Sequence, residues 1–197
     1  PYINPVPLDR EALGRLYQAI MKGHLPRLPP QAYRGRAYIF WTFTTNQRER
    51  FRDLPAFHGV LRELFLHSCA RYGLVTPVYV VMPDHLHFLW IGYRDASDQR
   101  LAARFLRRES RPHLAPVTWQ LQAFDHVVTA VERERQIYAD TVHYILQNPV
   151  RARLCEQWQA YPYLGAVIPG YPNLELRSPS FRERFWQIYR KLSAPGD

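Results

Sequence analysis

Two apolar runs joined by a very short connection constrain the fold of this chain more than any other feature. Residues 75–82 (VTPVYVVM) and 85–92 (HLHFLWIG) are separated only by Pro83 and Asp84. Runs of this length that are rich in β-branched and aromatic residues are typical of strands, and so short a connection makes them antiparallel. The sequence therefore predicts a β-hairpin at the centre of a sheet.

Helices and strands of similar length surround this β-hairpin. Their periodicity predicts helices over residues 57–72, 97–110 and 132–148 and strands over 37–45 and 120–129. Gly73 should stop the first helix and Pro149 the third, while Leu101, Phe105 and Leu106 are expected to face inward on the second. This order predicts an α+β fold in which helices pack on an antiparallel sheet, and ferredoxin-like variants fit it best.

The two ends of the chain differ from this central part. Residues 1–33 are rich in proline around a short amphipathic helix. Residues 179–192 predict a last helix with Phe181, Phe185, Tyr189 and Leu192 on one side. We expect an N-terminal extension at 1–33, a central domain at 34–166 and a C-terminal tail at 167–197.

The composition indicates a basic protein with a polyanionic partner. Lys and Arg number 26 against 17 Asp and Glu, the net charge is +9, and nearly all of the cations are arginine, whose planar fork binds phosphate. No apolar run approaches the roughly 20 residues that span a bilayer, so we expect a cytoplasmic protein with no membrane partner. Cys69 and Cys155 are too few and too far apart for a disulfide framework or a cysteine-rich zinc site.

His85 and His87 are the sharpest chemical feature. Residues two apart on a strand point to the same face, so both imidazoles could hold one divalent cation. Such a pair on a strand is more often an ordinary surface or core feature, and a third ligand is needed.

Tyr144 and Asn148 form a second constellation in the segment YILQNP. Residues four apart share a face of a helix, so the phenol and the carboxamide should lie one above the other. Tyr138, Val142 and Ile145 form the apolar stripe of the same helix, which places Tyr144 and Asn148 at the edge of the core. The alternative interpretation is a packed tyrosine whose hydroxyl meets solvent.

Together these motifs resemble the single-tyrosine HUH transposases. VVMPDHLH at 80–87 resembles their His-hydrophobic-His motif, YILQNPVRA at 144–152 resembles their nucleophile helix, and FDHVV at 124–128 and WQAYP at 158–162 resemble the segments around that helix. The form YxxxN is most similar to the REP-associated tyrosine transposases, which act on repetitive extragenic palindromes. The resemblance covers about residues 33–166 and implies an HUH endonuclease fold.

The resemblance implies a metal-dependent endonuclease and strand transferase that acts on single-stranded or hairpin DNA. Tyr144 would attack the scissile phosphate and leave a 5′-phosphotyrosine and a free 3′-hydroxyl. His85, His87 and Asn148 would hold Mg²⁺ or Mn²⁺. The insertion-sequence branch commonly has glutamine in place of Asn148, so the shorter amide must sit closer to the metal or act through water.

Several arginines are interpreted as DNA contacts in this context, and a nucleoid-associated protein is expected. They are Arg100, Arg104, Arg107 and Arg111, which form a stripe on one helix, and Arg151 and Arg153, which follow the tyrosine. The alternative for the stripe is a solvated helix face. Asp84 and Asp125 could join or orient the metal shell, but turn and strand-end roles are favoured for them.

Other functions stay open at this point. A domesticated protein that binds DNA hairpins without turnover would keep the same fold. Replication initiators and relaxases are usually larger, and a two-histidine phosphoesterase would need paired HxT or HxS motifs that this chain lacks. A monomer is expected by resemblance to the palindrome-associated branch, while dimers with swapped tyrosines occur among relatives.

Overall fold

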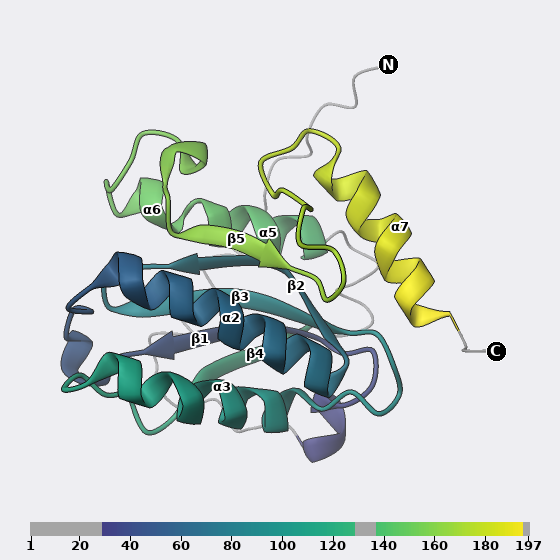
Figure 1. Ribbon diagram of the computed structural model, residues 1–197, viewed down its shortest axis with the longest axis horizontal. Helices are drawn as coiled ribbons and strands as arrows, with labels where there is room; N and C mark the ends of the chain where they lie inside the picture. Colours follow the sequence, from purple (N-terminus) through teal and green to yellow (C-terminus); the bar gives the residue numbers. More distant parts are fainter. Residues whose placement is uncertain (1–28, 129–136, 195–197) are drawn as a thin grey trace.

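A single antiparallel sheet organises the molecule. The computed structural model describes residues 29–128 and 137–194, and its five strands have the order β4-β1-β3-β2-β5 (Figure 1). The strands are β1 (Tyr38–Thr44), β2 (Leu74–Val81), β3 (His85–Gly92), β4 (Phe124–Val128) and β5 (Leu164–Val167). The α+β class and the central β-hairpin are therefore confirmed. The sequence did not predict β5, because its four residues include Gly165 and Ala166 and carry little strand propensity.

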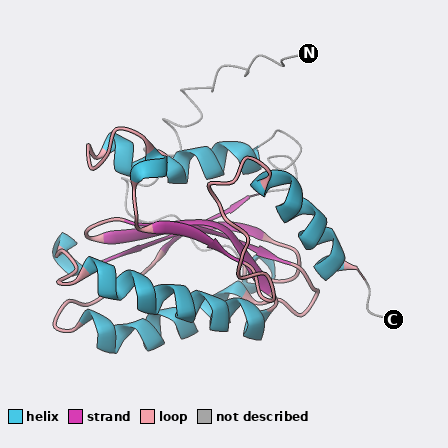
Figure 2. Ribbon diagram, turned by 45° about the horizontal axis from the view of Figure 1, so that its top comes forward, coloured by secondary structure: helices cyan, strands magenta, loops and turns pink. Residues whose placement is uncertain are grey.

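Helices cover both faces of this sheet (Figure 2). One face carries α2 (Leu54–Tyr72) and α3 (Gln99–Leu114), and the other carries α5 (Ile137–Leu146), α6 (Asn148–Arg151) and α7 (Phe181–Ser193). Short 3-10 helices, η1 (Pro30–Tyr33), η2 (Asn46–Arg48) and η3 (Trp158–Ala160), lie in the connections. No helix of residues 29–128 and 137–194 is long and apolar enough to cross a bilayer.

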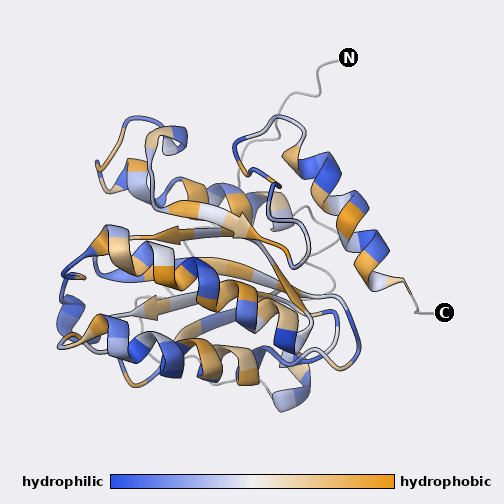
Figure 3. Cartoon of the chain, viewed as in Figure 1, coloured by the Kyte–Doolittle hydropathy of each residue, from blue (hydrophilic) through white to orange (hydrophobic). Residues whose placement is uncertain are grey.

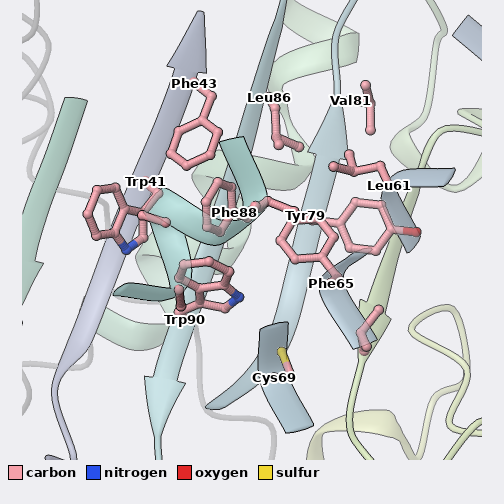
Figure 4. Packing of buried hydrophobic residues seen from close by; sticks show 14 of the residues in the cluster. Trp41, Phe43, Leu61, Phe65, Cys69, Tyr79, Val81, Leu86, Phe88 and Trp90 are labelled. Carbon is pink, nitrogen blue, oxygen red and sulfur yellow. The ribbon is translucent and has the colours of Figure 1, made fainter. Parts of the chain in front are cut away.

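Helices cover both faces of the sheet, and both faces carry buried apolar side chains. In Figure 3 the strands at the centre of the sheet are coloured largely as hydrophobic. Two hydrophobic clusters lie on the two sides of the sheet, and the residues of β1 alternate between them. Trp41 and Phe43 pack toward α2 and α3 in the first cluster, whereas Phe40 packs toward α5 in the second. Figure 4 shows the first of these clusters, where the rings of Phe43 and Phe88 meet edge to face with their centroids 5.0 Å apart. The second cluster includes Phe185 of α7, which is fully buried.

The residues at its two ends explain where α2 begins and ends. The carboxylate of Asp53 accepts a hydrogen bond of 2.9 Å from the Ala56 amide, which satisfies one of the free N–H groups of the first turn. Gly73 ends the helix at φ 67°, a left-handed conformation that glycine adopts without a steric penalty. The predicted stop at Gly73 is therefore confirmed.

Three details of the helices differ from the sequence-based expectations. Leu101 is 45% exposed, because α3 turns Ala102 and Ala103 inward in its place, while Leu106 is buried as expected. The same helix continues through Pro112 to Leu114. Pro149 does not end the helix that carries Tyr144, because α5 already ends at Leu146. Pro149 lies instead in the first turn of α6, where a backbone N–H would have no partner within the helix. The expected start of that helix at residue 132, and the short helix in 1–33, lie outside the described residues.

Gly92 supplies a sharp test of this packing, because a Cβ there would lie 1.9 Å from the Gly35 carbonyl oxygen. We expect Gly92→Ala to lower the free energy of unfolding by about 1–3 kcal/mol through overpacking. A Cβ at Gly59 in α2 would have no neighbouring atom within 4 Å, so Gly59→Ala should raise stability by up to about 1 kcal/mol. Urea unfolding of both variants checks this, and equal stability of the two would contradict it.

Candidate active site

The two histidines of β3 share the face of the sheet that α5 covers. His85 pairs with Thr44 and His87 with Thr42 across the β1–β3 ladder. The imidazole centroids lie 4.7 Å apart with an interplanar angle of 81°. The structure thus places both rings together, as period-two alternation on a strand requires.

His87 lies deep in this face and is held by its Nδ1 atom. Nδ1 lies 2.8 Å from Thr42 Oγ1, and the ring stacks on Phe40 with the centroids 5.5 Å apart. Burial, followed by the charges of His85, Arg151 and Arg48, lowers the pKa of His87 well below its usual value. The ring is therefore neutral at neutral pH. In the tautomer whose Nδ1–H donates to Thr42, the Nε2 lone pair is available to a ligand.

His85 is held in the same way by a carboxylate. Its Nδ1 lies 2.5 Å from Asp84 Oδ1, and Arg48 Nη1 lies 3.5 Å from Asp84 Oδ2. Burial raises the pKa of Asp84, but the hydrogen bond to His85 and the charges of His85 and Arg48 outweigh it, so this pKa lies below its usual value. An ionised carboxylate behind an imidazole fixes the ring and its tautomer, which is the usual second layer of a metal site.

Tyr144 of α5 meets these histidines from above the sheet. Its ring lies edge to face with His87 at a centroid distance of 6.1 Å and with Phe40 at 5.7 Å. The side chain is 9% exposed, so it sits in the core cluster and not merely at its edge as its helical position suggested. The phenol and both imidazoles therefore occupy one face of the molecule.

Asn148 follows one turn later, and both ends of its carboxamide form hydrogen bonds. Its Nδ2 donates to the carbonyl oxygens of Tyr144 at 2.9 Å and Ile145 at 3.2 Å, and its Oδ1 accepts from Arg151 Nη2 at 3.0 Å. The Arg151 guanidinium carbon also lies 4.2 Å from the centre of the Tyr144 ring. Arg151 thus joins the two residues that the sequence singled out on this helix.

Two imidazoles completed by oxygen ligands are a donor set that a divalent cation can occupy. Among residues 29–128 and 137–194, no three His, Cys, Asp or Glu side chains are grouped to hold a metal, so a third ligand has to come from an amide, from water or from a substrate. The Nδ1 atoms of His85 and His87 are engaged by Asp84 and Thr42, so the Nε2 atoms are the ring nitrogens left to face such an ion.

The arginine stripe lies on the opposite face of the sheet. Arg100, Arg104 and Arg107 of α3 line a cavity of about 250 Å³ whose walls also include Trp41 and Asp125. Trp41 and Asp125 lie opposite each other in β1 and β4. Trp41 precedes Thr42 by one residue, so its side chain points to the sheet face opposite that of Thr42 and His87. The sheet therefore separates these arginines from Tyr144.

The remaining predicted residues divide between the two faces. Asp125 accepts a hydrogen bond from Tyr33 on the α3 face, which removes it from the surroundings of the histidines. Asp84 contacts His85 directly, so its turn position also orients a ring. Arg111 and Arg153 are exposed, and Arg153 has a positive φ of 57° just after α6.

Sequence reasoning missed two contributors to the site, Thr42 and Arg48. Thr42 had a signal, because a hydroxyl in the otherwise aromatic centre of β1 needs a hydrogen-bond partner when it is buried. Arg48 had no such signal in the sequence. It contacts Asp84 from η2, a short element with a positive φ of 60° at Arg48, and no periodic pattern predicts such an element.

Comparisons with known proteins agree with this architecture. No family model matches the sequence, and no curated protein is significantly similar to it. Among solved structures, the chain is similar to a REP-associated tyrosine transposase bound to a REP hairpin, with a TM-score of 0.59 and 18% identity over 89% of this chain and 92% of that one. At this identity the likeness concerns the fold alone: the expected antiparallel sheet with helices packed on it is shared with that structure.

The contact between Thr42 and His87 can be tested by stability alone. Thr42→Val removes the hydroxyl and leaves a buried ring nitrogen without its partner, so we expect the free energy of unfolding to fall by about 1–3 kcal/mol. Thr44→Val is the matched control on the same strand face, since no hydrogen bond of its hydroxyl occurs within the described part of the chain; it should change stability by less than about 0.5 kcal/mol. Equal losses in urea unfolding would contradict the assignment.

Proposed function

We propose that this protein is a metal-dependent single-stranded DNA endonuclease and strand transferase of the transposase type, acting on palindromic hairpin DNA. The observation that carries the proposal is the edge-to-face contact of Tyr144 with His87, 6.1 Å between centroids, on the sheet face that also holds His85. The structural likeness to a transposase bound to a REP hairpin supports the same class of substrate.

Tyr144 is the nucleophile in this proposal. Its phenolic oxygen forms a bond to the scissile phosphorus and loses its proton, while the bond from phosphorus to the 3′ oxygen breaks and that oxygen leaves as a 3′-hydroxyl after taking up a proton. The DNA end is then stored as a 5′-phosphotyrosine. The reverse attack by the 3′-hydroxyl of another strand restores a phosphodiester, which makes strand transfer possible without an external energy source.

The residues around Tyr144 prepare the site for a polyanion. Arg151 lies over its ring, and Arg48 lies beside Asp84 and His85. Both guanidiniums are exposed and positively charged, so they attract a phosphodiester to the same face. The ring of Tyr144 is buried against Phe40 and His87, which restricts its movement.

His85, His87 and Asn148 are the residues that would hold Mg²⁺ or Mn²⁺. When bound there, the ion would act as a Lewis acid on a non-bridging phosphate oxygen. Thr42 and Asp84 keep the two rings oriented whether or not an ion is present, since their contacts are to the Nδ1 atoms.

The cavity beside α3 is proposed as a second DNA contact. Arg104 is exposed and lines this cavity between Arg100 and Arg107, and single-stranded or hairpin DNA binds to such clusters through its phosphates. Because the sheet separates this surface from Tyr144, it would contribute to affinity and positioning rather than to bond breaking.

Tyr144→Phe tests the nucleophile. With a hairpin oligonucleotide labelled at its 3′ end and Mg²⁺ or Mn²⁺, wild-type protein should form a covalent adduct that survives denaturing electrophoresis. We expect Tyr144→Phe to reduce its formation by at least about a thousandfold, because no other group replaces the covalent step.

Tyr138→Phe is the matched control for this experiment. It removes the same hydroxyl from the same helix, where the Tyr138 ring packs on Trp186 with the centroids 4.8 Å apart. Adduct formation by Tyr144→Phe at the wild-type level would overturn the proposal. If wild-type protein binds the oligonucleotide but forms no adduct, and His87→Ala binds equally well, the chain is instead a non-catalytic DNA-hairpin binding protein.

Arg104→Ala tests the second contact. Loss of one phosphate contact should weaken hairpin binding and flatten the plot of log affinity against log salt by about one unit of slope. Arg108→Ala is the control on the same helix, because that guanidinium already pairs with Glu109 at 2.6 Å. Fluorescence anisotropy over a range of salt concentrations measures both effects, and identical slopes for the two variants would contradict the assignment.

A further inference from the structure

We infer that Arg151 is a latch that keeps Asn148 from binding a metal ion until a DNA phosphate draws the arginine away. The inference rests on the proposed function and concerns how its metal site is completed. It starts from one observation: the Asn148 oxygen, which that function assigns to the ion, accepts a hydrogen bond of 3.0 Å from Arg151 Nη2.

The Asn148 carboxamide cannot rotate away from Arg151 without breaking its own hydrogen bonds to α5. Its Nδ2 donates to both the Tyr144 and the Ile145 carbonyl oxygens, so the amide plane is fixed by the end of α5. Its Oδ1 therefore points away from those carbonyls, and Arg151 occupies that direction. The helix presents the oxygen, and the arginine covers it.

A guanidinium and a divalent cation exclude each other at this oxygen. Both carry positive charge, and a cation bound to Oδ1 would lie only a few ångströms from the guanidinium, where like charges repel strongly. Metal binding at Asn148 and the bond to Arg151 are therefore alternative states. Without DNA, any ion has only His85 and His87 from this set.

A DNA phosphate is the group that can exchange the two states. Arg151 is exposed, and its second contact is the face of the Tyr144 ring, 4.2 Å from the guanidinium carbon. Both contacts of the guanidinium are to neutral groups. A phosphate offers the guanidinium two parallel hydrogen bonds to anionic oxygens, which are stronger than its single hydrogen bond to a neutral amide oxygen. A phosphate arriving beside the Tyr144 hydroxyl thus competes for Arg151 and uncovers Asn148 at the place where the ion is needed.

The arrangement couples substrate to metal in both directions. If phosphate binding opens Oδ1, then a bound ion must by linkage favour phosphate binding to the same extent. Arg151 is a positioning residue in this scheme, since it controls Asn148 without touching the ion.

Mn²⁺ titration of the full chain without DNA, followed by electron paramagnetic resonance of the free ion, tests the latch. Arg151→Ala should bind Mn²⁺ about three- to tenfold more tightly than wild type, which corresponds to the release of one hydrogen bond. Because removal of any nearby positive charge also favours a cation, Arg153→Ala serves as the control: it removes the same charge two residues later and should have the smaller effect.

The double variant separates the latch from simple charge removal. In the Asn148→Ala background no oxygen is left to uncover, so adding Arg151→Ala should give no more than the Arg153→Ala effect. A gain that persists in this background, or equal gains from Arg151→Ala and Arg153→Ala, overturns the latch. In the Tyr144→Phe background, which keeps the ring that Arg151 covers but cannot cleave, a hairpin oligonucleotide should tighten Mn²⁺ binding when Arg151 is present and much less when it is alanine.

Failure of the latch and failure of the proposed function give different results. If His87→Ala abolishes Mn²⁺ binding while the double variant shows no coupling, the metal site stands and only the latch is overturned. If His87→Ala leaves Mn²⁺ binding unchanged, the proposed metal site is overturned and the latch with it.

Discussion

The register of β1 against β3 is the constraint on which the candidate site depends. It sets Thr42 opposite His87 and Phe40 opposite Leu89, so the imidazole has a hydrogen-bond partner and an aromatic support on the same face. Because side chains alternate along a strand, a slip of one residue would move both histidines to the α2 and α3 face. The buried aromatic residues on both faces prevent this slip, so the packing of the core also fixes the chemistry.

The sheet divides the molecule into two chemically different surfaces. One carries the phenol, the imidazoles and Arg151, and the other carries the cavity with Arg100, Arg104 and Arg107. Strand β4 is the outer strand beside both, with Asp125 facing the cavity. In the proposed function, a DNA molecule that contacted both surfaces would have to pass around an edge of the sheet.

Much of the fold could be predicted from sequence because its signals are local. The connection at Pro83 and Asp84 fixes the β-hairpin, and Gly73 fixes the end of α2. The position of Tyr144 over His87 depends on how α5 docks, and the face occupied by the arginines depends on how α3 docks; neither is encoded in a single segment. The contacts of Arg48 and Arg151 depend on short irregular elements, and no periodic pattern in the sequence predicts such elements.

The amide at position 148 has a physical consequence that a carboxylate would not share. A carboxylate there would form an ion pair with Arg151, stronger than the observed hydrogen bond to a neutral amide oxygen and harder for a phosphate to replace. A neutral oxygen holds the guanidinium weakly, and its own amide nitrogen remains anchored to the carbonyl groups of Tyr144 and Ile145 while the guanidinium is exchanged. An asparagine at this position is therefore compatible with a ligand that stays fixed in direction and still changes partner, which a site assembled only on its substrate requires.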